Sequence, residues 1–276
     1  MAHPHPETIS PTAHYTGYVW FAHGHSHPAF ATRTGRAMYR VLRGPNAIAT
    51  LTGLPSLEGM LLARHRLIDQ RLTHAIEHDG ITQVVEVATG LSPRGWRFRQ
   101  NYGSRITYVE ADLPDMLANK RRILADLGGE TAHHRTQEID ALADAGARSI
   151  DAICAQLDPA RGTAIITEGL INYFDGPTVA GMWRRFATAL ARFPTGRYFS
   201  DIMYEDRHPL VNGFKFLLSA FVRSKVHLHF DGDTATIAAL HDAGFAHPAI
   251  LHPNDFPLPD LDRAGARHVS IIEATV

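Results

Sequence analysis

The strongest constraint on the fold is a short run of mostly apolar residues, Val-Val-Glu-Val-Ala, at positions 84–88. Such a run is typical of a strand that is buried on both faces of a parallel sheet. Further strands are predicted at 106–110, 136–139, 163–167, 198–203, 247–251 and 268–275. Strands that alternate with helical segments predict an α/β fold, in which helices cover both faces of a mostly parallel sheet.

Apolar residues at helical spacing occupy the intervals between these strands. Helices are expected at 57–77, from Pro114 to the Gly128-Gly129 pair, at 150–157, at 178–191 and at 234–242. Gly80 is a plausible stop after the first of them, and Pro114 suits a first helical turn. Cys154 falls among the apolar positions of its helix, which predicts a core residue rather than a nucleophile.

Two segments interrupt the alternation. The first precedes residue 57 and is rich in aromatic residues, which we interpret as short helices covering a site. The second, 204–230, is an insertion that also carries clustered aromatics. We therefore expect an N-terminal helical cap or lid over 1–80, and a cofactor-binding core over 81–276 with the insertion 204–230 as part of the lid.

Charge and composition exclude several classes of function. Among 276 residues the formal net charge is −1, and no basic stripe suggests a nucleic-acid partner. The basic cluster Lys120-Arg121-Arg122 is expected on a solvated helix face. One cysteine rules out an intramolecular disulfide, and no apolar run of about 18 residues could span a bilayer. With no signal-peptide pattern, the chain is expected to be cytoplasmic, without membrane insertion.

Three alternating histidines, His23, His25 and His27, could share one face of an extended segment and bind a metal ion. No cysteine or carboxylate completes a familiar ligand set. A polar loop before Pro28 is therefore the preferred interpretation, and no metal is expected.

Ligands of parallel sheets bind at the carboxyl ends of the strands. There the first strand runs into a turn at Gly90, and Glu110 closes the second strand twenty residues later. This pattern also occurs in NAD-dependent oxidoreductases. However, Ala88 and Pro93 stand where the dinucleotide fingerprint has its first and third glycines. The turn therefore departs from the dinucleotide pattern at two positions. A cofactor without a pyrophosphate, such as S-adenosylmethionine, can be accepted by a looser turn of this kind.

Several motifs in order resemble the leucine carboxyl methyltransferase family. They are Leu62-Ala63-Arg64, Val84 through Arg94, Val109-Glu110-Ala111-Asp112-Leu113-Pro114 with Lys120-Arg121 after it, and Glu168-Gly169-Leu170-Ile171-Asn172-Tyr173. The opening Pro11-Thr12-Ala13-His14-Tyr15-Thr16-Gly17-Tyr18-Val19-Trp20 is similar to a bacterial branch that includes the tetracenomycin carboxyl methyltransferase of polyketide synthesis. The resemblance implies a Rossmann-like class I methyltransferase sheet, mostly parallel with an antiparallel last strand.

The resemblance also implies S-adenosyl-L-methionine as cofactor and a role for each matching residue. Arg64 would hold the methionine carboxylate, and Glu168 would face the amino group or the methyl centre. Ala88 and Gly90 would line the methionine moiety, Glu110 would take the ribose hydroxyls, and Glu138 with Ile139 would lie at the adenine. Asp112 would either contribute to this site or help to start the helix near Pro114.

The expected acceptor is a carboxylate of a small, aromatic or polyketide-like metabolite. A phenolic hydroxyl is the alternative, and a base would then be useful. The catalytic residue stays open, with candidates His14, Tyr15, His208 and Arg207, the last as a cation that could place a carboxylate. Methylation of a protein C-terminal carboxyl and non-catalytic cofactor binding are the remaining alternatives. The sequence does not indicate the oligomeric state.

Overall fold

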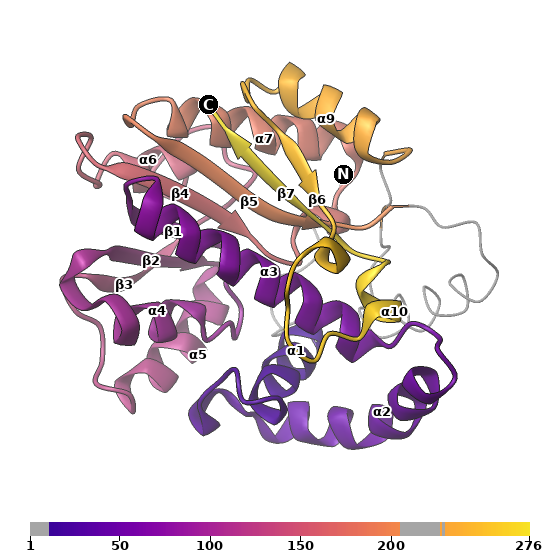
Figure 1. Ribbon diagram of the computed structural model, residues 1–276. Helices are drawn as coiled ribbons and strands as arrows, with labels where there is room; N and C mark the ends of the chain where they lie inside the picture. Colours follow the sequence, from indigo (N-terminus) through magenta and orange to yellow (C-terminus); the bar gives the residue numbers. More distant parts are fainter. Residues whose placement is uncertain (1–10, 205–226, 228–229) are drawn as a thin grey trace.

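The computed structural model describes residues 11–204, 227 and 230–276. Its centre is a seven-stranded sheet in the order β3-β2-β1-β4-β5-β7-β6 (Figure 1). The strands are β1 (Ile81–Val87), β2 (Thr107–Asp112), β3 (His134–Glu138), β4 (Gly162–Thr167), β5 (Gly196–Ile202), β6 (Ala249–Leu251) and β7 (Ser270–Thr275). The first five are parallel, whereas β7 runs antiparallel to both β5 and β6. The predicted fold class, with its antiparallel end, is confirmed.

Helices cover both faces of this sheet. One face carries α3 (Leu57–His78) and α4 (Arg94–Tyr102), and α5 (Pro114–Ala125) packs beside β2 and β3. The other face carries α6 (Ile150–Cys154), α7 (Gly176–Leu190) and α9 (Asp233–Asp242). A short α10 (Arg263–Ala266) packs against α3. Helix α4 was not among the predicted helices, because its many polar residues show little apolar periodicity.

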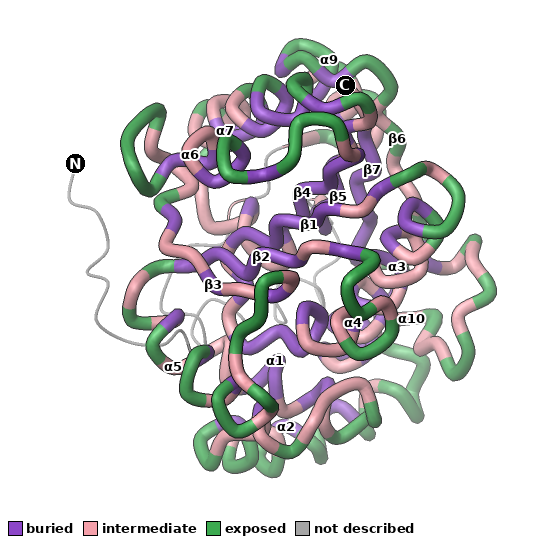
Figure 2. The backbone as a smooth tube through the Cα atoms, turned by 90° about the vertical axis from the view of Figure 1, so that its left-hand side faces the viewer, coloured by how far each residue is buried: buried purple, intermediate pink, exposed green. Residues whose placement is uncertain are grey.

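The two faces explain the apolar runs of the strands. Val85 and Val87 of β1 lie in the core beneath α6 and α7, whereas Val84 lies in the core beneath α3 and α4. Because successive side chains of a strand point to opposite faces, a strand covered on both sides must be apolar at successive positions. Figure 2 shows the strands as the buried centre of the molecule. Cys154 is buried in this core, as predicted, and burial raises the pKa of its thiol to about 12.

The N-terminal segment forms α1 (Pro11–Ala22), the single turn η1 (Pro28–Phe30) and α2 (Arg33–Leu51). The expectation of short helices is wrong for α2, which runs for 19 residues even though Pro45 lies inside it. Proline has no backbone N–H, so the Val41 carbonyl loses its hydrogen-bond partner within the helix. Val41 lies on the exposed, outward-facing side of α2. Gly35 allows α2 to approach α1, since a Cβ there would lie 2.2 Å from the His14 carbonyl oxygen.

The insertion predicted at 204–230 lies almost wholly outside the described residues, as do His208 and Arg207. Among the helices of the described ranges, none combines the length and the apolar character that crossing a bilayer requires.

Candidate functional site

The carboxyl ends of β1, β2 and β4 meet at one edge of the sheet, where the register aligns Val87 with both Ala111 and Thr167. The turn after β1 is tightly bent, because Ala88 and Gly90 both have left-handed backbone angles, with φ of +55° and +52°. A side chain makes this conformation unfavourable by roughly 1–2 kcal/mol. Ala88 therefore holds a strained conformation at the position where the dinucleotide fingerprint has glycine.

The backbone at Gly90 is open to a ligand. Among the described residues, a Cβ at this position would have only the Ala13 side chain within 4 Å, at 3.6 Å. Gly169, two residues after β4, has a φ of +70°, and the three atoms nearest to a Cβ at this position would belong to the Arg64 guanidinium, at 3.0–3.5 Å. Two glycine turns, one from β1 and one from β4, thus frame the same stretch of the sheet edge.

Asp112 lies at this edge as the last residue of β2. Its carboxylate accepts the backbone N–H of Gly90 at 2.6 Å and that of Leu113 at 2.8 Å. Burial raises the pKa of Asp112, and these backbone donors only partly offset the effect. Asp112 thus links β2 to the glycine turn, and both interpretations of this residue, at the cofactor and at the start of α5, are compatible with its position.

Glu110 lies one pleat deeper on the same face of β2 and is fully buried. Its Oε1 contacts Nε2 of His134 at 2.6 Å, and its Oε2 pairs with Lys120 and accepts the Thr89 hydroxyl at 3.1 Å. Burial would raise the pKa of Glu110, but the charge of Lys120 and the His134 contact lower it to about 2. Glu110 is fully buried, whereas 8% of Asp112 is exposed, so the geometry favours Asp112 over Glu110 for direct contact with a ligand.

Gly95 explains how Glu110 is covered. A Cβ at this position of α4 would lie 2.4 Å from the Glu110 Oε1, so only glycine lets the helix pass over the carboxylate. The dinucleotide fingerprint has such a close-packing glycine at the position of Pro93. In this chain Gly95, two residues after Pro93, makes the corresponding close approach to β2.

Glu138 is the last residue of β3 and Ile139 follows it, beside β2. Glu138 is aligned with Asp112 in the parallel register, and the Ile139 amide donates to the Asp112 carbonyl at 3.0 Å. Ile139 is buried and Glu138 is half-buried. Their adjacency to Asp112 agrees with the role that the resemblance assigns to them.

Arg64 projects from α3 to the end of β4. Its Nε donates to Glu168 Oε1 at 3.1 Å and its Nη1 to Asp201 Oδ2 at 2.9 Å. Asp201, near the end of β5, also accepts the Gly169 amide at 2.6 Å. Asp201 was not among the residues predicted for this site. The two carboxylates fix the guanidinium beside the Gly169 turn, where 13% of the Arg64 side chain remains exposed.

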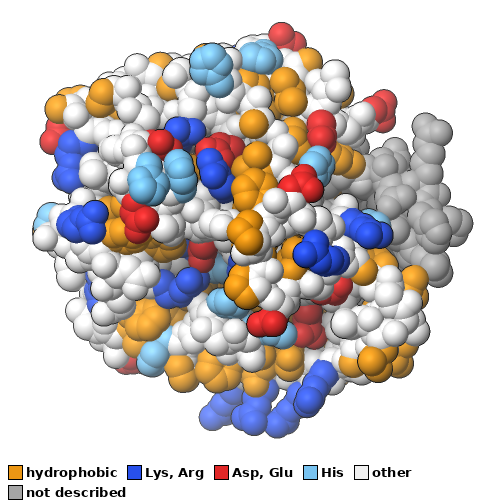
Figure 3. All heavy atoms as spheres, viewed as in Figure 1, with side chains coloured by type: hydrophobic (Ala, Val, Ile, Leu, Met, Phe, Trp, Pro, Cys, Tyr) orange, Lys and Arg blue, Asp and Glu red, His pale blue; other side chains and the backbone are white. Residues whose placement is uncertain are grey.

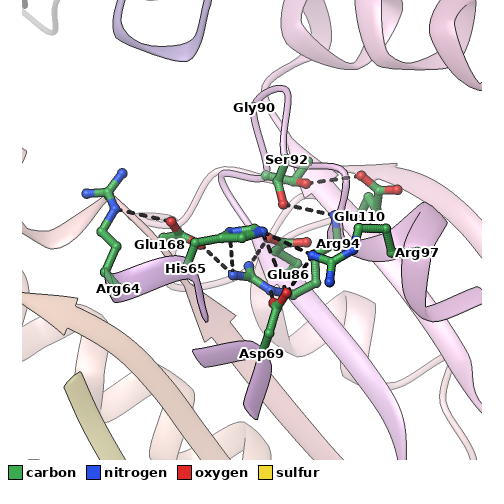
Figure 4. A network of polar contacts seen from close by, with 12 residues as sticks. Arg64, His65, Asp69, Glu86, Gly90, Ser92, Arg94, Arg97, Glu110 and Glu168 are labelled. Carbon is green, nitrogen blue, oxygen red and sulfur yellow. Dashed lines mark hydrogen bonds and ion pairs between the residues drawn. The ribbon is translucent and has the colours of Figure 1, made fainter. Parts of the chain in front are cut away.

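Behind Arg64 lies a buried network of charges centred on Arg94 (Figure 4). The Arg94 side chain is fully buried and donates to Asp69, Glu86 and Glu168. His65 also contacts Glu168, at 2.9 Å, and its ring packs at a tilt against Trp20 of α1, with the ring centroids 4.4 Å apart. The whole network therefore joins α1, α3, β1, α4 and the end of β4.

The network sets the protonation state of Glu168. Burial would raise the pKa of this carboxyl, but the positive charges of His65, Arg94 and Arg64 outweigh burial and hold the pKa far below its ordinary value. Glu168 is therefore a carboxylate at neutral pH, and it holds the Arg64 guanidinium in place.

The two described candidates for catalysis lie in the cap. Tyr15 is buried between α1, α2 and α3, where its hydroxyl accepts from Asn46 at 3.0 Å and burial raises its pKa. The Nδ1 of His14 contacts the hydroxyl of Thr32, the residue that caps α2, at 2.9 Å. Both side chains thus have structural partners among the described residues.

The three alternating histidines do not converge. His23 pairs with Glu58, and His27 caps the turn η1. His25 has its pKa lowered to about 4 by burial and by nearby positive charge. In the described ranges no three metal-ligating side chains gather.

Lys120 corrects one prediction. Arg121 and Arg122 are exposed as expected, but Lys120 is fully buried and reaches Glu110, Thr89 and the Ser92 carbonyl. Its neighbours in sequence gave no indication of this.

The buried roles of Arg94 and His65 were also missed. The one available signal was Glu86, a charged residue in the middle of an apolar strand, which requires a buried partner.

Comparisons with known proteins agree with this geometry. Residues 26–187 match the family model described as leucine carboxyl methyltransferase. A "putative S-adenosyl-L-methionine-dependent methyltransferase" from Mycobacterium marinum is 31% identical over 221 residues, which is 74% of this chain and 69% of that protein. One of the same description from Mycolicibacterium smegmatis is 39% identical over 114 residues, or 41% of this chain and 36% of that protein. Both descriptions agree with the predicted cofactor.

Solved structures show the same fold at low identity. A crystal structure of a putative methyltransferase from Thermobifida fusca superposes with a TM-score of 0.61 and 14% identity, covering 96% of this chain and 97% of that one. The chain spans less than half of the length of the first curated relatives that it matches.

Proposed function

This chain belongs to the leucine carboxyl methyltransferase family, and we propose that it transfers a methyl group from S-adenosyl-L-methionine to a carboxylate oxygen of a small, aromatic or polyketide-like metabolite. The observation that carries the proposal is the pair of glycine turns at Gly90 and Gly169, with Asp112 beside the first and Arg64 beside the second. These groups stand at the edge where ligands of such sheets bind.

The donor groups fit this cofactor. Its ribose has two hydroxyls, which could donate hydrogen bonds to the Asp112 carboxylate. Its methionine end is a zwitterion. The Arg64 guanidinium suits the carboxylate of that end, and the two carboxylates that flank Arg64, Glu168 and Asp201, suit its ammonium group. Glu138 and Ile139, next to Asp112, would border the adenine, while Ala88 and Gly90 would line the methionine moiety.

The bound cofactor would supply a methyl group already activated on a sulfonium. The protein then has to align an acceptor oxygen with that methyl group and exclude water, and such alignment can supply roughly 7–11 kcal/mol of the barrier. A carboxylate is ionised at neutral pH and needs no base. In keeping with this, His14 contacts Thr32 and His65 contacts Glu168, both in structural roles.

The N-terminal motif supports a small acceptor. This motif, the one similar to the bacterial biosynthetic branch, forms α1, and α1 lies directly on the turn after β1. Ala13 approaches Gly90, and a Cβ on Gly17 would lie 3.2 Å from the Leu91 Cβ. The motif thus stands beside the place proposed for the reactive end of the cofactor, where it would form a wall of the acceptor space.

The product tests the proposal. Incubation with S-adenosylmethionine and a panel of aromatic acids should give a mass gain of about 14, in a product that mild alkali hydrolyses. Because no proton is removed from a carboxylate, the single-turnover rate should be flat from about pH 6 to 9. An alkali-stable product, with a rate that rises through a pKa of about 6.5, would instead indicate a phenol and a histidine base. Cofactor binding without any turnover across the panel would favour a non-catalytic role.

Arg64 provides a second test. We expect Arg64→Ala to weaken binding of S-adenosylhomocysteine, measured by calorimetry, by about 2–4 kcal/mol, because the ligand carboxylate loses its charged partner. Arg64→Lys should retain part of the affinity. Arg66→Ala, two residues along the same helix, is the matched control and should bind normally. Equal affinity of Arg64→Ala and the wild type would remove Arg64 from the cofactor site.

A further inference from the structure

Helix α2 has an outer face that the fold does not use. Five large hydrophobic residues are exposed in the described ranges, and four of them lie on α2 or the turn that follows it. They are Val41, Ile48, Leu51 and Leu54, with exposures of 75%, 64%, 86% and 39%. The helix is held to the protein by its opposite side, where Gly35, Leu42 and Asn46 are buried. The outer apolar residues are therefore not part of any core.

These residues form a stripe with a basic stripe beside it. Ala37, Val41, Ile48 and Leu51 follow one another at spacings of four, seven and three, which places them on one side of a helix. The adjacent row consists of Arg33, Arg36, Arg40 and Arg43, all exposed. The helix contains no acidic residue. Figure 3 shows Lys and Arg side chains gathered along the lower edge of the molecule, where Figure 1 places α2.

We propose that α2 docks the protein on an anionic lipid surface, with its apolar stripe in the headgroup region and its arginines against the lipid phosphates. An apolar stripe flanked by arginines is the pattern of helices that lie in the plane of a membrane interface. The net charge of the whole chain is −1, so attraction of the entire protein to an anionic surface is not expected. Any such attraction must come from this local surface.

Two other occupants fit less well. A second copy of the chain, related by a twofold axis, would bring four arginines against four arginines with no acid on either helix. An apolar protein segment would need a groove, but the apolar side chains of α2 protrude. The hollow of about 330 Å³ on the inner flank of α2 has the carboxylates of Glu58, Asp260 and Asp262 in its wall, which an apolar segment would have to desolvate. A bilayer, in contrast, accepts protruding side chains without shape complementarity.

Vesicle flotation of the full chain at about 0.1 M salt tests the proposal. Vesicles containing about one-third phosphatidylglycerol should bind the protein at least tenfold more tightly than vesicles of phosphatidylcholine alone. Arg36→Glu/Arg40→Glu should reduce this binding about tenfold or more. Ile48→Ser/Leu51→Ser should do the same, because it removes the inserted side chains. The matched control, Arg105→Glu/Arg122→Glu, has the same charge change at exposed positions elsewhere and should bind within twofold of the wild type.

A label distinguishes insertion from loose adsorption. The native Cys154 is buried, so Ala37→Cys can carry an environment-sensitive dye, whose emission should shift to the blue on anionic vesicles. The proposal is overturned if both kinds of vesicle bind equally, or if the control pair loses as much binding as the α2 pairs. It is also overturned if no vesicle binds while ultracentrifugation shows a dimer that Ile48→Ser/Leu51→Ser dissociates. Neither readout depends on methyl transfer.

Discussion

Arg94→Met is expected to lower the free energy of unfolding by about 4 kcal/mol or more. The substitution removes the cation that three carboxylates share, those of Asp69, Glu86 and Glu168, and Arg94 itself is fully buried. Removing one partner from a buried ion pair typically destabilises a protein by about 3–5 kcal/mol, because the charge left behind is neither solvated nor paired. Urea unfolding at pH 7 measures the effect.

Arg97→Met is the matched control. Its guanidinium binds Asp69 as well, but 27% of the side chain is exposed and Asp69 is its only carboxylate partner in the described part of the chain. We expect a loss of about 1 kcal/mol or less. If Arg94→Met does not fold, Arg94→Lys keeps the charge and should give an intermediate loss. A change below about 1 kcal/mol in the Arg94 variant would contradict a central role for this network.

A double-mutant cycle separates repulsion from lost packing. Combining Arg94→Met with Glu86→Gln should recover part of the stability, because one of the stranded carboxylates is neutralised. Tyr108 donates to the other oxygen of Glu86, at 2.7 Å, and would still have an acceptor. Strict additivity of the two substitutions would argue against direct coupling between Arg94 and Glu86.

The sheet was predictable because its strands are covered on both faces. β1 and β4 are buried throughout or nearly so, and they gave the clearest signals. β3 is polar, with the sequence His-Arg-Thr-Gln-Glu, since it lies at an edge of the sheet and only part of it is buried. The length of α2 could not be inferred, because Gly35, Gly44 and Pro45 suggest an interrupted helix. Packing on α1 and α3 supports it instead.

The site was predictable as a location and less so in its detail. The motifs pointed to turns that the structure brings to one edge of the sheet. However, residues two apart on a strand point the same way, and the motif alone cannot say which lies at the edge. The structure places Asp112 at the edge and Glu110 beneath α4. The contacts of Arg94 with Asp69 and Glu168 join residues 25 and 74 positions apart, so the register of the fold had to be known before they could be found.

Glu110→Gln is expected to destabilise the protein in a way that depends on pH. At pH 7 the free energy of unfolding should fall by about 3–5 kcal/mol, because the fully buried Lys120 loses its carboxylate partner. The folded pKa of Glu110, about 2, lies below its value in the unfolded chain, about 4.3. Its contribution is therefore fully present above the unfolded pKa and is lost as the pH falls toward the folded pKa.

The difference between wild type and Glu110→Gln should accordingly be constant above about pH 5.5 and shrink as the pH falls below the unfolded pKa. At pH 2 this difference in stability would be about 3 kcal/mol smaller than at pH 7, since one pKa unit corresponds to about 1.36 kcal/mol. Glu77→Gln, at an exposed position of α3, is the control and should change stability by less than about 0.5 kcal/mol at every pH. Urea unfolding from pH 8 down to the acid transition measures both variants. A gap that stays constant down to the acid transition would mean that folding does not shift the pKa of Glu110, and that Lys120 does not stabilise its charge.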